Sequence, residues 1–212
     1  MNKLNKVCIT SICIIFLLFN NCFASEYSLD DLNKIIQLDP TNIQAYSDRG
    51  AFYAKIGIYE KAIDDYNRAI ELDPNNTNFY LQRGATYVKL EQYKMAIDDC
   101  NRAIKLNPNY DLAYFMRAII YEDLKQYQNS ISDYSKVIEL NPEAIGAYFA
   151  RGLTYGMLEQ YEKSISDYNK IIELNPNAAE AYAYRGLAYI LIGNKTQGEH
   201  DIDKARQLGF QI

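Results

Sequence analysis

The chain has 212 residues, of which 49% are hydrophobic and 23% are charged, a composition typical of a folded protein and not of a disordered one. It carries 27 acidic and 22 basic residues, a formal charge of -5, and no run of lysines and arginines forms a stripe that could follow a phosphate backbone. The composition therefore argues against a nucleic acid as the partner.

The first two dozen residues differ in kind from the rest of the chain. Lys3 and Lys6 supply a positive start, residues 7–19 are an apolar run, and small residues lead to a cleavage position after Ala24. We therefore predict a signal peptide over 1–24. The protein is then expected to be exported, and to be either periplasmic or secreted.

Two alternatives would keep the protein on a membrane through this N-terminal segment. The apolar run could stay as an anchor, but it is shorter than the roughly 20 residues that span a bilayer as a helix. Cys22 could be acylated, but Asn21 is a poor fit to the small residue that such processing prefers. Cleavage would leave Cys100 as the remaining cysteine, so no internal disulfide is expected.

After the N-terminal segment the sequence indicates a single helix. Ser28 and the acids that follow it are typical of a helix start. Ile35, Ile36 and Leu38 then continue an apolar stripe as far as Pro40. We interpret residues 25–42 as a leading half repeat.

The rest of the chain repeats every 34 residues. A tyrosine follows each proline after six residues, an arginine after nine, a second tyrosine after thirteen and an aspartate after 25. A glycine follows each of these arginines except at Ala118. Such a period is typical of repeat proteins. The prolines are Pro40, Pro74, Pro108, Pro142 and Pro176.

Each period has the pattern of a helical hairpin. Tyr46 and Gly50 are four residues apart and share one face of a first helix predicted over 42–56. Gly57 breaks that helix. A second helix is predicted to end just before Pro74, because proline cannot continue a helix.

The motif Tyr-x2-Arg-Gly-x2-Tyr at 46–53, followed by Ala-x3-Tyr at 62–66 and by Pro74, resembles the tetratricopeptide repeat. The resemblance implies an all-α fold, a right-handed α-solenoid of helix-turn-helix units. With the half repeat, this gives eleven helices. The five expected units are 43–76, 77–110, 111–144, 145–178 and 179–212.

An arginine and an aspartate recur in every unit, sixteen residues apart. Charges at a fixed place in a repeat could bind a ligand or could tie helices together. Their presence in all units favours a structural ion pair or hydrogen-bond network. These residues are Arg49, Arg83, Arg117, Arg151 and Arg185, with Asp65, Asp99, Asp133, Asp167 and Asp201.

The resemblance also implies a concave face, lined by first-helix residues outside the repeat motif. In the first two units these positions are mainly polar, and from the third unit onward they are apolar. An apolar groove of this kind predicts the docking of an extended or helical segment of another protein, unless some of its side chains fill gaps between units. The groove positions are Leu112, Phe115, Met116, Ile119, Phe149, Leu153, Met157, Tyr184, Leu187 and Leu191.

Nothing in the sequence points to catalysis, a cofactor or a metal. His200 is the only histidine, and its acidic neighbours are more typical of a solvated surface than of a metal site. We therefore predict a non-catalytic adaptor that binds a protein or peptide in its groove. The alternative is a structural assembly component that self-associates or joins an envelope complex without a peptide ligand. The identity of the partner and the oligomeric state do not follow from the sequence.

Overall fold

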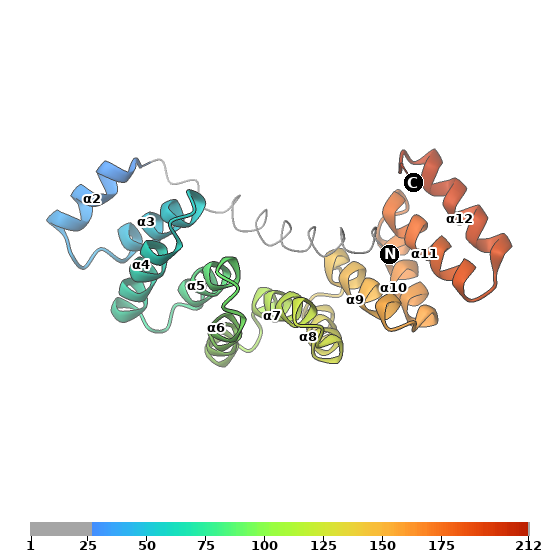
Figure 1. Cartoon of the computed structure of the whole chain (residues 1–212), viewed down its shortest axis with the longest axis horizontal. Helices are drawn as coiled ribbons and strands as arrows, with labels where there is room; N and C mark the ends of the chain where they lie inside the picture. The colour runs from blue at the N-terminus through green and yellow to red at the C-terminus, as the bar shows by residue number, and fades with distance from the viewer. Residues whose placement is uncertain (1–26, 212) are drawn as a thin grey trace. The chain divides into compact units, whose positions relative to one another are not determined.

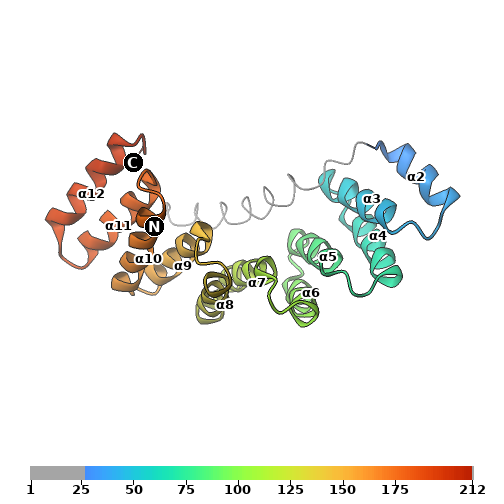
Figure 2. The same cartoon turned by 180° about the vertical axis from the view of Figure 1, so that it is seen from behind.

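The computed structural model describes residues 27–211, and every regular element within that range is an α-helix (Figures 1 and 2). The predicted all-α helical-repeat fold is confirmed, whereas the predicted signal peptide lies outside the described residues. The eleven helices of this range are α2 (Leu29–Leu38), α3 (Ile43–Lys55), α4 (Tyr59–Leu72), α5 (Thr77–Lys89), α6 (Tyr93–Leu106), α7 (Asp111–Asp123), α8 (Tyr127–Leu140), α9 (Ile145–Met157), α10 (Tyr161–Leu174), α11 (Ala179–Leu191) and α12 (Lys195–Gln207).

The helices form two compact units that meet in sequence between Asp123 and Leu124. In the first unit α3 pairs with α4 and α5 pairs with α6, while α2 packs on α3 and α7 packs on α6. In the second unit α9 pairs with α10 and α11 pairs with α12, while α8 packs on α9. Four complete hairpins therefore lie within single units.

Helices α2, α4, α6, α8 and α10 each end at an Asp or Asn that comes directly before a proline, whereas the C-cap of α12 is Leu208. Asp73 has φ of -137° and ψ of 87°, its N–H still donates to Ala69 O, and its side chain accepts a hydrogen bond from the backbone N–H of Asn75. The same side-chain bond recurs at Asp39, Asn107, Asn141 and Asn175. Because proline disfavours a helical residue before it, this turn sets the end of the five helices that precede a proline.

The turn between the two helices of each hairpin contains one residue in the left-handed region. Gly57 and Gly193 occupy it with φ of 80° and 85°. Glu91, Lys125 and Glu159 occupy the same place with φ of 57°, although this region favours glycine. Helix termination here therefore does not depend on a glycine.

Small residues allow the helices of a hairpin to approach closely. A Cβ atom on Gly50 would lie 2.9 Å from the Tyr66 ring, and one on Gly186 would lie 2.8 Å from the backbone oxygen of Gly198. The buried face of each second helix begins with Ala62 or its equivalents Ala96, Ser130, Ser164 and Gly198. Tight packing of this kind orients the arginine and the apolar residues described below.

Candidate partner-binding surface

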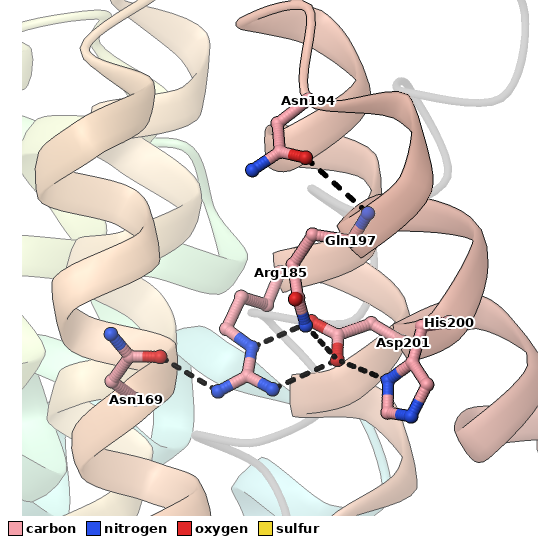
Figure 3. Close-up of polar contacts among 6 residues, drawn as sticks. All are labelled: Asn169, Arg185, Asn194, Gln197, His200 and Asp201. Atoms are coloured by element: carbon pink, nitrogen blue, oxygen red, sulfur yellow. Dashed lines mark hydrogen bonds and ion pairs between the residues drawn. The ribbon is translucent and has the colours of Figure 1, made fainter.

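Arg185 joins three helices of the second unit (Figure 3). Its Nε and Nη2 atoms donate hydrogen bonds of 2.7 and 2.9 Å to the two carboxylate oxygens of Asp201 on α12. Its Nη1 atom donates a 2.7 Å hydrogen bond to Asn169 on α10, in the preceding repeat. One guanidinium thus holds its own hairpin together and also holds the second helix of the preceding repeat.

The same arrangement recurs wherever the arginine and the aspartate lie in one unit. The two bonds to the aspartate are 2.6–3.0 Å long, and the third bond, to the preceding repeat, is 2.6–2.9 Å long. Arg117 donates to Asn101, and its predicted partner Asp133 lies in the other unit. The sets that lie within one unit are Arg49 with Asp65 and Asn33, Arg83 with Asp99 and Asn67, Arg151 with Asp167 and Ser135, and Arg185 with Asp201 and Asn169.

Two tyrosines flank every arginine of the repeat. The guanidinium carbon lies 5.3–6.0 Å from the ring centroids of the tyrosine three residues earlier and the tyrosine four residues later. This distance allows a cation–π attraction. The tyrosines of the motif therefore help to position the arginine as well as to fill space.

Hydrogen bonding to the Asp65 carboxylate raises the pKa of Arg49, so this arginine stays charged. Burial raises the pKa of Asp99, while the hydrogen bonds from Arg83 oppose that rise. The guanidinium N–H groups donate hydrogen bonds to two other helices, so the arginine acts in helix packing. The geometry therefore favours the structural interpretation of these charges over a ligand site.

Sequence reasoning missed the third partner of the arginine. Asn33, Asn67, Asn101 and Asn169 follow the same 34-residue period, with Ser135 in the remaining place. That regularity was visible in the sequence, sixteen residues before each arginine. It marks the contact between successive repeats, which the arginine and aspartate alone do not reveal.

The predicted groove positions of the second unit form an apolar surface on α9 and α11, and their side chains differ in solvent exposure. Leu187 and Leu191 are exposed, at 47% and 61%, and Leu153 and Met157 are half-buried. We call this surface the α9–α11 face; its residues are Phe149, Leu153, Met157, Tyr184, Leu187 and Leu191.

The two aromatic residues of this face are anchored in the core. Phe149 and Tyr184 pack edge to face with ring centroids 5.3 Å apart, and both contact the buried Tyr168 at 5.8 and 6.0 Å. Their rings therefore form the floor of the face and also support the fold. Burial raises the pKa of Tyr184, as expected for a half-buried phenol.

In the first unit the predicted groove is smaller than expected. Leu112 and Phe115 on α7 are half-buried, but Met116 and Ile119 are only 1% and 2% exposed. Met116 fills the space beside Gly84, where an added Cβ would lie 2.9 Å from its terminal methyl. The prediction that Met116 and Ile119 line an open groove is wrong for the chain as it stands, because both belong to the core.

The remaining candidate from the sequence is His200, which is 75% exposed on α12. Its Nδ1 atom lies 3.7 Å from Asp201 Oδ1, an oxygen that also accepts a hydrogen bond from Arg185 (Figure 3). Among residues 27–211, no group of three or more His, Cys, Asp or Glu side chains is arranged to hold a metal ion. No helix in the same range is both long and apolar enough to cross a membrane.

Comparison with known proteins agrees with this repeat geometry. The model of the tetratricopeptide repeat matches residues 43–76, 78–110, 112–143 and 146–178. The chain belongs to the tetratricopeptide repeat family. Residues 179–212 lie beyond these matches, although α11 and α12 form the same hairpin with the same arginine–aspartate pair.

Solved structures of other tetratricopeptide repeat proteins have a similar fold. A crystal structure of MamA is 27% identical, covers 78% of this chain and 91% of its own, and has a TM-score of 0.71. MamA from Desulfovibrio magneticus RS-1, from residue 41 to its end, is 22% identical with a TM-score of 0.70, covering 78% of this chain and 94% of its own. YrrB, a tetratricopeptide repeat protein with an unusual peptide-binding site, is 22% identical with a TM-score of 0.69, covering 86% and 94%. The search of curated protein sequences gave no match.

Proposed function

We propose that the chain is a non-catalytic scaffold that holds a segment of another protein against the α9–α11 face, outside the cytoplasm. The observation that carries this proposal is the exposure of Leu187 and Leu191 beside half-buried apolar neighbours on two adjacent helices. Exposed apolar side chains gathered on one face are typical of a binding surface. Family membership and the peptide-binding site of YrrB support the same class of function.

The charge of this face indicates which segment it would hold. Glu180, Tyr184, Leu187 and Leu191 follow one another at helical spacing along α11, so an exposed acid begins the apolar stripe. A partner segment with leucine-sized apolar side chains and a basic residue at one end would match this order. Export is proposed on the separate ground of the N-terminal 1–24 segment.

The proposal is tested with a displayed library of random peptides selected on the full chain. Changing both Leu187 and Leu191 to glutamate should weaken the selected peptides at least about tenfold, since each change places a charge on the apolar contact. Met95→Glu is the matched control, because Met95 is as exposed as Leu187 but lies on α6. Circular dichroism would show that all variants keep their helices.

Two results would contradict this function. The first is peptide affinity that the leucine changes leave intact, or that Met95→Glu lowers to the same degree. The second is an absence of selected peptides together with self-association of the chain in sedimentation, which would favour a structural assembly role instead.

A further inference from the structure

Helix α2 is half of a hairpin. It packs against α3 as α4, α6 and α10 pack against the first helix of the next repeat. Within the described residues it pairs with no first helix of its own. It lies at one end of the first unit (Figure 1). The other second helices show which positions of α2 a first helix would cover.

The partner-facing side of a second helix has three positions that are buried in every complete hairpin. They hold a small residue, the repeat aspartate and a small or apolar residue, spaced by three and four residues. The sets are Ala62, Asp65 and Ala69; Ala96, Asp99 and Ala103; Ser164, Asp167 and Ile171; and Gly198, Asp201 and Ala205. The corresponding residues of α2 and its N-cap are Ser28, Asp31 and Ile35.

In α2 this side is open. Ser28 and Asp31 are exposed and Ile35 is half-buried. Leu38 extends the same side and is 77% exposed, whereas its counterparts Leu72, Leu106, Leu140, Leu174 and Leu208 are half-buried. We call Ser28, Asp31, Ile35 and Leu38 the open α2 face.

Asp31 also lacks the partner that its counterparts have. The aspartates of the complete hairpins each accept two hydrogen bonds from an arginine and have 0–6% of their side chains exposed. Asp31 instead accepts hydrogen bonds at Oδ2 from the backbone and side chain of Ser28, at 3.1 and 2.6 Å. Its second oxygen accepts no hydrogen bond among the described residues, and the carboxylate faces solvent.

We propose that the open α2 face docks an amphipathic helix of a partner protein, one that carries an arginine flanked by tyrosines and followed by a small residue. This surface is distinct from the α9–α11 face, so the inference goes beyond the function proposed above. The chemistry of the occupant is read from this chain, where four second helices are covered by helices with that pattern. The arginine bonds Asp31, the small residue permits close approach, and Ile35 and Leu38 lose their exposure.

The experiment measures binding of a labelled synthetic peptide with the sequence of residues 77–92 to the full chain by fluorescence anisotropy. This peptide carries the pattern through Tyr80, Arg83, Gly84 and Tyr87. Asp31→Asn should weaken binding about tenfold, as expected for loss of charge-assisted hydrogen bonds. Asp30→Asn is the matched control, because it removes the same charge from the same helix at a position that does not face the partner.

A double-mutant cycle then tests whether the arginine of the peptide contacts Asp31. The peptide variant Arg83→Gln should bind wild type about as weakly as the parent peptide binds Asp31→Asn, and combining the two changes should add little. Leu38→Gln should weaken binding several-fold without touching the N-cap, and this variant keeps the test valid if Asp31→Asn frays α2. Leu187 and Leu191 changes should have no effect.

Three results would overturn the proposal. One is the lack of saturable binding. Another is equal weakening by Asp31→Asn and Asp30→Asn, which would show general charge attraction only. The third is a dimer that Leu38→Gln dissociates, because the face would then be covered by a second copy of the chain.

Discussion

The arginine of each repeat places its charge in a partly buried site with little access to water. Arg83 has 20% of its side chain exposed, and Asp99 has 6%. Two hydrogen bonds connect them in a parallel fork, which suits the planar guanidinium and would not suit lysine. The pair is therefore sensitive to loss of either member.

We expect Arg83→Leu to lower the free energy of unfolding by about 3–5 kcal/mol, because it leaves the Asp99 carboxylate buried without its partner. Arg206→Leu is the matched control. Its pair with Asp203 is exposed, so its loss should cost no more than about 1 kcal/mol. Urea unfolding followed by circular dichroism measures both changes.

A second variant separates the pair from the packing around it. Changing Arg83 and Asp99 to leucine together should recover part of the lost stability, since no unpaired charge then stays buried. Equal costs for Arg83→Leu and Arg206→Leu would show that the buried pair has no special structural role.

Sequence reasoning reached the arginine and the aspartate but not the third member of this network. The two charges recur without exception, so their spacing alone indicates a pair. Asn33 and its counterparts are polar residues of the kind found on any helix surface, and Ser135 interrupts their series. Their role depends on how one repeat lies on the next, which a residue pattern within one repeat does not contain.

At the scale of the element, the turns that place Glu91, Lys125 or Glu159 in the left-handed region carry a small strain. Glu159 adopts φ of 57°, a conformation that glycine takes at little cost and that other residues rarely take. Gly57 and Gly193 show that the same turn accepts glycine elsewhere in this chain. The side chain of Glu159 is exposed, so little packing depends on it.

We expect Glu159→Gly to raise the free energy of unfolding by up to about 1 kcal/mol, because it removes the left-handed strain. Glu162→Gly is the matched control, since Glu162 is exposed in the first turn of α10 and glycine lowers helix stability by about 1 kcal/mol. Thermal unfolding compares the two variants. A loss of stability in both would mean that the turn carries no strain.

The residues at which helices end could be predicted from the sequence more closely than the burial of side chains on those helices. Proline and the residue before it end every second helix except α12 by local chemistry, so their spacing predicts those ends directly. The burial of Met116 and Ile119 has a different origin. Helical periodicity tells which residues share a side, but the extent to which a neighbouring helix covers that side depends on the distance between the helices. Gly84 brings α5 near enough for Met116 to fill the gap.

At the scale of the whole chain, burial is distributed unevenly along the repeats. Helix α5 has seven buried residues in thirteen, whereas α2 has one in ten, Leu32. Helix α12 has three buried residues in thirteen, and its sequence is the most polar among the described helices. In a repeat array each helix is stabilised mainly by its neighbours, so helices with little buried surface open first.

We therefore expect amide hydrogen exchange to be fastest in α2 and α12 and slowest in α5. The capping box at Ser28 slows fraying of α2, but it cannot replace a covering helix on the open α2 face. Mass-spectrometric exchange on the full chain measures the order directly. Addition of the residue 77–92 peptide should then slow exchange in α2 and leave α12 unchanged, because only α2 gains a partner. Uniform exchange across α2, α5 and α12 would contradict this account and would indicate that the chain opens in one cooperative step.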